Sequence, residues 1–196
     1  DIDIAKELYN KGKYVSTYRQ FEKIQQRVEP KSELYSEAEY YKAVSALHAG
    51  YRSGDELIRT FVETYPDSPY MNSAQFNLGK NQFEKRQYTL AVRTFAKVDR
   101  SDLSENERIE LQYQNGFANL EQRNTDVAYR EFMSIRQSNN LYSKPATYYC
   151  AHIQYLNEDY DAALEGFTAL NNDPAYSPVI PLYVSPVSYT HLRAHE

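Results

Sequence analysis

The sequence has one cysteine, no tryptophan and no long apolar run. The single Cys150 excludes an internal disulfide and any zinc site built from several thiolates. No apolar run approaches the ~18 residues that a membrane-spanning helix needs, so we expect no transmembrane segment. The first residues, Asp1 to Lys6, lack a basic region followed by an apolar core. We therefore expect a signal peptide to be absent or already removed.

Positive charge is also scarce. The formal net charge is −5, and no block rich in lysine and arginine occurs. Because a protein that neutralises phosphates usually shows a basic face, we expect no nucleic-acid partner. Tyrosine, in contrast, is abundant: its 20 copies suit helix–helix seams that stay partly wet, and they equally suit interaction surfaces.

Sequence signatures of catalysis are missing. The chain has no G-x-S-x-G elbow, no Walker loop, no G-x-G-x-x-G and no H-E-x-x-H. Cys150 could act as a nucleophile with His152, but side chains two residues apart on one helix point to different sides. We interpret Cys150 as a buried structural thiol. We expect no enzymatic activity, no cofactor and no metal.

Phenylalanines recur in similar contexts along the chain, at separations of 40, 34, 37 and 35 residues. The residue four positions before each phenylalanine is small in most cases. The residue three positions after it is apolar or β-branched. The spacing i, i+4, i+7 places these residues on one helical face. The five phenylalanines are Phe21, Phe61, Phe95, Phe132 and Phe167.

A second set of positions lies 16 residues before the phenylalanines, and every residue there is small. A small residue at this register lets the second helix of a hairpin approach the first closely. Ser104 to Glu107 and Ser36 to Glu39 match the capping box and predict helix starts, and Arg52 to Gly54 predicts a turn inside a hairpin. No segment shows sustained alternation, so we predict an all-α protein. The small residues are Ala5, Ser45, Gly79, Gly116 and Ala151.

The third hairpin carries the most specific pattern, which resembles the tetratricopeptide repeat: Leu78-Gly79 followed by Phe83, Tyr88, Ala91, Phe95 and Val98. This resemblance implies an α-solenoid of about five helical hairpins in a right-handed superhelix. The array would span residues 1–184. Leu57 and Thr125 depart from the repeat pattern, and the first repeat is degenerate. The repeats would cover about residues 1–30, 32–66, 68–99, 104–137 and 143–171, with the start of a sixth at 177–184.

The segment from Phe61 to Ser68 resembles the F-x-x-x-Y-P-x-S linker common in repeat proteins of the Gram-negative cell envelope. The whole run is similar to the N-terminal part of long, tyrosine-rich, multi-repeat envelope proteins of such bacteria. This likeness implies a periplasmic or outer-membrane-associated protein, with the cytoplasm as the alternative.

The C-terminal segment breaks the repeat pattern. Residues 187–196 resemble the translation of a transposase adapter used to prepare sequencing libraries, so we interpret residues 185–196 as a non-native tail. The alternative is a natural polar tail that binds metal through His191 and His195, whose i, i+4 spacing suits a helix. Sequencing reads across codon 187 decide between the two.

The repeat family implies a binding surface, because the first helix of each hairpin lines the concave face of the superhelix. Several of the matching residues lie seven apart, on one helical face. They could grip an apolar or extended segment of a protein or peptide partner, or they could simply pack between neighbouring repeats. The carboxylate-clamp pattern of chaperone-binding members is not reproduced. The candidate residues are Phe76, Lys80, Phe83, Tyr113, Phe117, Leu120, Tyr148, His152 and Tyr155.

We therefore predict an interaction scaffold that binds a protein or peptide partner on the concave surface of the helical repeats, in cell-envelope assembly. The alternative function is a structural spacer within a longer repeat array, with no dedicated ligand.

Overall fold

The computed structural model describes residues 2–184, so the interpretation of residues 185–196 as a non-native tail falls outside the described part of the chain. The described residues form helices joined by short connections, with no strand among them. The all-α prediction is therefore confirmed. The helices are α1 (Ile2–Asn10), α2 (Tyr14–Gln25), α3 (Glu33–His48), α4 (Gly54–Thr64), α5 (Met71–Glu84), α6 (Tyr88–Phe95), η1 (Arg100–Asp102), α7 (Glu105–Glu121), α8 (Thr125–Ile135), α9 (Ser143–Leu156) and α10 (Tyr160–Ala169).

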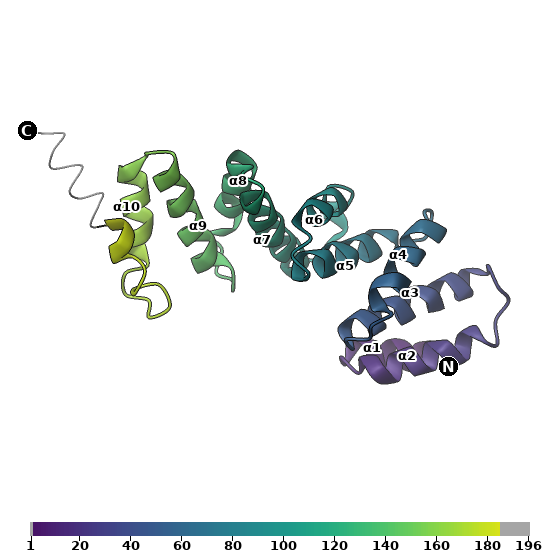
Figure 1. The fold of residues 1–196 in the computed structure, drawn as a ribbon. Coiled ribbons are helices and arrows are strands. Elements are labelled where there is room, and N and C mark those ends of the chain that lie inside the picture. Colours follow the sequence, from purple (N-terminus) through teal and green to yellow (C-terminus); the bar gives the residue numbers. More distant parts are fainter. Residues whose placement is uncertain (1, 185–196) are drawn as a thin grey trace, which may run out of the picture. The chain divides into compact units, whose positions relative to one another are not determined.

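Consecutive helices pack as hairpins in chain order, as the ribbon in Figure 1 shows. The chain divides into two compact units at Leu103 and Ser104. The first unit contains the hairpins α1–α2, α3–α4 and α5–α6. The second contains α7–α8 and α9–α10, followed by a helical turn at residues 181–184. Within each unit the arrangement is that of a helical-repeat protein, whereas the right-handed superhelix stays a prediction.

The turn inside each hairpin has the same backbone geometry. The second residue after the first helix has a positive φ angle. Its N–H donates to the carbonyl three residues earlier, and the next N–H donates to the carbonyl five residues earlier. This pair of hydrogen bonds is the Schellman motif. Its five copies have N···O distances of 2.8–3.1 Å. The positive-φ residues are Gly12, Gly50, Arg86, Arg123 and Glu158.

The second hairpin turn differs from the predicted one. The sequence points to Arg52 through Gly54, but the left-handed residue is Gly50, and Gly54 is the first residue of α4. Gly54 is buried against the α3 backbone, where an added Cβ would lie 2.8 Å from the Leu47 nitrogen. Its small size therefore serves helix contact, whereas the turn uses the conformational freedom of Gly50.

Capping determines where two of the first helices begin. Ser104 and Glu107 form the predicted capping box at the start of α7. The predicted box at Ser36 is wrong, because Ser32 caps α3 one turn earlier by accepting a hydrogen bond from the Tyr35 N–H. Ser36 lies inside α3, and its hydroxyl donates to the Glu33 carbonyl.

The recurring phenylalanines form the centre of each hairpin. All five have 0–1% of their surface exposed. In the third hairpin, a Cβ added at Gly79 would lie 2.5 Å from the Phe95 ring, and in the fourth, one at Gly116 would lie 3.0 Å from the Phe132 ring. The small residue of the first helix and the phenylalanine of the second are therefore in direct contact.

Replacing Gly79 with alanine tests this contact. Alanine favours helix by about 1 kcal/mol over glycine, but its methyl group would displace the buried Phe95 ring at a cost of about 1–3 kcal/mol. We expect Gly79→Ala to be less stable than Gly116→Ala by about 1–2 kcal/mol, because the second clash is milder. Urea denaturation followed by circular dichroism measures the difference, and equal midpoint shifts would contradict the packing described.

The turn geometry gives a second prediction. A non-glycine residue in the left-handed region costs about 1 kcal/mol or more, so Arg123→Gly should stabilise the chain by roughly 0.5–1 kcal/mol. The matched control is Arg130→Gly, an exposed interior position of α8, which should lose about 1 kcal/mol. Thermal unfolding of the two variants compares them, and a loss of stability in both would rule out the strained turn.

Candidate functional site

The predicted site residues of α5 face the interior more than the surface. Phe76 is 2% exposed, so its ring offers almost no area to a partner. The Lys80 ammonium lies 5.2 Å from the centre of the Phe76 ring and covers it. Phe83 is half-buried, with its ring 5.7 Å from that of Tyr88 in the same hairpin. On this helix, Lys80 and Phe83 retain partial exposure.

The predicted residues of α7 are Tyr113, Phe117 and Leu120, and all three are half-buried. They pack against the core shared by α7, α8 and α9. Tyr113 stacks on Tyr142 with 4.6 Å between ring centres, and Phe117 meets Tyr149 edge-on at 5.5 Å. Burial raises the pKa of Tyr113, so its phenol stays protonated and neutral. Each side chain thus divides its surface between packing and solvent.

The predicted residues of α9 surround a tyrosine from the chain after α10. Tyr148 and Tyr183 lie with their hydroxyl oxygens 3.3 Å apart. The Tyr155 ring meets Tyr183 edge-on at 5.3 Å, and Tyr183 stacks on Phe167 at 4.6 Å. Tyr183 lies in residues 177–184, where the start of a sixth repeat was predicted, but its place in this cluster was not predicted. Its separation of 34 residues from Tyr149, close to the spacing of the recurring phenylalanines, was the available signal.

His152 lies in the same aromatic surroundings. Its ring is parallel to that of Tyr148 at 6.3 Å and edge-on to Tyr183 at 5.7 Å. Its Nδ1 has no hydrogen-bond partner among the described residues. Burial lowers the pKa of His152, because the imidazolium would lose water without gaining an ion partner. We infer that the imidazole is neutral at pH 7.

A lowered histidine pKa makes stability depend on pH. The unfolded chain binds the proton near the ordinary pKa of 6.5, whereas the folded chain binds it at lower pH. The contribution of neutral His152 is therefore complete above pH 6.5 and is lost as the pH falls through the folded pKa. We expect the urea midpoint to fall more steeply below this pH in the parent than in His152→Gln. Identical slopes, or an NMR-measured pKa at or above 6.5, would contradict this environment.

Cys150, the alternative nucleophile, is fully buried and free. Burial raises the pKa of its thiol to about 11. At neutral pH the thiolate, which is the reactive form, is therefore almost absent. The geometry is that of a structural thiol packed in the core of the second unit.

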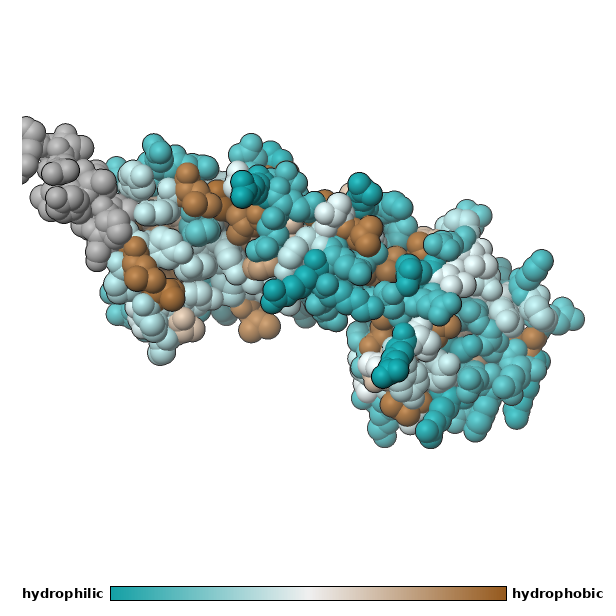
Figure 2. Space-filling view, viewed as in Figure 1, coloured by the Kyte–Doolittle hydropathy of each residue, from teal (hydrophilic) through white to brown (hydrophobic). Residues whose placement is uncertain are grey.

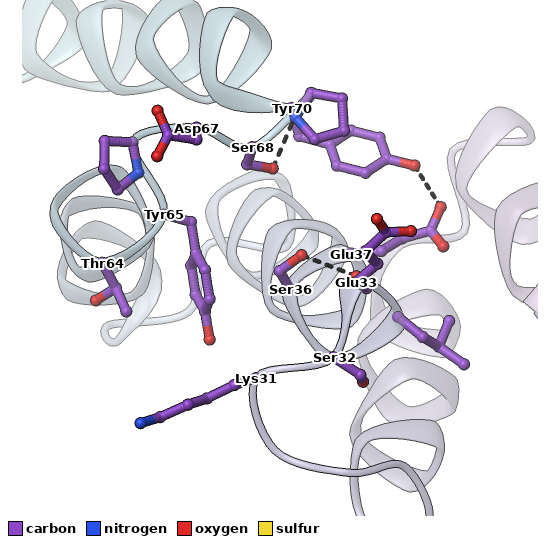
Figure 3. Close-up of a pocket in the computed structure, with 13 residues that line it drawn as sticks. Lys31, Ser32, Glu33, Ser36, Glu37, Thr64, Tyr65, Asp67, Ser68 and Tyr70 are labelled. Atoms are coloured by element: carbon purple, nitrogen blue, oxygen red, sulfur yellow. Dashed lines mark hydrogen bonds between the residues drawn. The ribbon is translucent and has the colours of Figure 1, made fainter.

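A hollow of about 680 Å³ in the first unit was not predicted from the sequence. It lies between two inter-hairpin linkers and the first turn of α3, and Figure 3 shows its lining side chains. Tyr65, Pro66, Asp67 and Ser68, which belong to the linker motif, form part of its wall. The two linkers show no periodic pattern of hydrophobic residues, so nothing in the sequence indicated that they would enclose a space.

Apolar side chains are scattered over the rest of the surface. Figure 2 shows separate small apolar patches on the viewed face rather than a continuous stripe. The most exposed are Leu141, Leu182 and Leu156. Residues 2–184 contain no helix with the length and hydropathy required to cross a membrane. Within that range, no group of His, Cys, Asp or Glu side chains has a metal-binding arrangement.

No protein-family model matches the chain, and no curated protein matches it.

Proposed function

We propose that this protein is a tetratricopeptide-type scaffold that binds a protein or peptide segment on the first helices of its hairpins. The observation that carries the proposal is the row of half-buried side chains on α7 and α9. Two helices of successive hairpins present them at the same register, and none is fully buried. The row consists of Tyr113, Phe117 and Leu120 on α7 and Tyr148, His152 and Tyr155 on α9.

The chemistry of this row favours an apolar, extended or helical segment. Partly exposed aromatic rings give large contact area at low cost in side-chain entropy and keep a polar group at the rim. The neutral His152 adds an uncharged, half-buried ring to the row. Binding would therefore rest on ring contacts, with few charged contributions.

A location in the cell envelope of a Gram-negative bacterium is part of the same proposal. It is supported by the resemblance of the repeats and of the Phe61 to Ser68 linker to envelope repeat proteins. The competing function is a structural spacer in a longer repeat array, for which the same rings would serve packing alone.

Selection of peptides from a random displayed library against the immobilised chain tests the function. We expect enriched peptides whose affinity falls at least about tenfold for the double variant Phe117→Ala, Tyr155→Ala, since each truncation should cost about 1 kcal/mol. Circular dichroism of the double variant should show intact helices, so that the loss of affinity is not caused by unfolding.

The matched control is Tyr129→Ala, Met133→Ala on α8, which also removes two half-buried side chains that pack against the core of the second unit. It should change affinity by less than about twofold, because its residues lie on the second helix of the hairpin. No enrichment, or equal losses in both double variants, would favour the spacer.

A further inference from the structure

We infer that the hollow in the first unit is a second binding site, which takes an extended peptide segment through an arginine or lysine side chain. The site shares no residue with the row on α7 and α9, so it can hold or fail independently of the proposed function. Its volume of about 680 Å³ lies within the range of pockets that bind small ligands and short segments.

Two linkers and one helix start build the walls. The linker before α3 contributes Lys31 and Ser32, and the linker before α5 contributes residues 65–70. Ser32 and Ser68 are both engaged in local hydrogen bonds, which hold the linkers: Ser32 accepts from the Tyr35 N–H and Ser68 from the Tyr70 N–H. The walls are therefore formed before any ligand arrives.

Lys31 stands out among the residues with left-handed backbone. Every other described residue with positive φ lies in a hairpin turn, where the Schellman geometry requires it. Lys31, at φ 71°, lies instead in the linker that borders the hollow. A left-handed lysine costs about 1 kcal/mol or more, and such strain is concentrated at binding sites.

The charges of the hollow favour a cation. Glu37 is already neutralised, because it pairs with Lys6 and accepts a hydrogen bond from the Tyr70 hydroxyl. Glu33 and Asp67 are exposed carboxylates with no ion pair among the described residues, against one exposed cation, Lys31. An incoming arginine or lysine would balance this excess of negative charge.

The aromatic wall fits the same occupant. Tyr65 is half-buried, its ring is held 5.2 Å from that of Phe61, and burial raises its pKa, so the phenol stays neutral. In Figure 3 its ring points from the linker toward the side where Lys31 and Ser36 lie. A guanidinium or ammonium group over this ring would gain cation–π attraction, while Pro66 and Pro69 would contact the aliphatic stem.

Fluorescence anisotropy with a short labelled Gly/Ser peptide containing two arginines tests the site. We expect saturable binding to the whole chain that weakens with added salt. A peptide with citrulline in place of arginine keeps the shape and loses the charge, and it should bind at least about tenfold more weakly. Absence of binding by the arginine peptide, or equal binding of the citrulline peptide, would overturn the proposal, as would preference for a glutamate peptide.

Two double variants locate the binding. Glu33→Gln, Asp67→Asn should reduce the affinity about tenfold. Glu105→Gln, Asp126→Asn makes the same change in net charge at exposed positions of the second unit and should reduce it by less than about twofold. Equal losses of affinity in the two double variants would show that the peptide is attracted to the overall charge of the protein, and would contradict the proposed site. Tyr65→Leu should weaken arginine binding more than the control variant does, and an unchanged affinity would contradict the cation–π contact.

Discussion

The contact between a phenylalanine of the second helix and a small residue of the first is the interaction on which each hairpin depends. Where the small residue is glycine, even one methyl group would enter the ring, as at Gly79 and Phe95. In the fifth hairpin the relation extends to the partner helix, where a Cβ at Gly166 would lie 2.8 Å from that of Ala151. Close approach fixes the helix spacing, and the spacing in turn fixes which rings reach the surface.

Polar contacts join neighbouring hairpins but contribute less. Asp55 of α4 accepts from the Asn81 side chain of α5 at 2.6 Å and lies 3.2 Å from the Lys85 ammonium. Exposed pairs of this kind contribute about 0–1 kcal/mol each, whereas removing a buried phenylalanine ring costs about 3–5 kcal/mol. Packing therefore contributes more to the stability of the array than these ion pairs do. In the fourth hairpin a buried hydrogen bond from the Asn115 side chain to the Glu131 carboxylate, at 2.8 Å, joins the two helices of one hairpin.

The hairpins could be predicted from sequence because their packing repeats at a fixed register. Ala5, Ser45 and Ala151 occupy the same position in their hairpins as Gly79 and Gly116. A small residue found five times at one position is stronger evidence for a helical hairpin than any single helix signal. The start of α3 and the second hairpin turn were missed because Ser36 and Gly54 have residue types suited to caps and turns, while tertiary contact decided their use. For the candidate site, the resemblance to the repeat family implied the positions on α7 and α9. It did not indicate that Phe76 is covered or that Tyr183 packs against Tyr155. Both features depend on contacts between rings that are far apart in the sequence, and such contacts leave no periodic pattern in a single sequence.

We propose that a partner segment binds the first helices of the hairpins. Hydrogen exchange followed by mass spectrometry, with and without a library-selected peptide, tests it most directly. We expect slower exchange in α7 and α9 on binding, with exchange in α8 and α10 unchanged. Protection confined to α8 and α10, or no protection in any described helix, would contradict it.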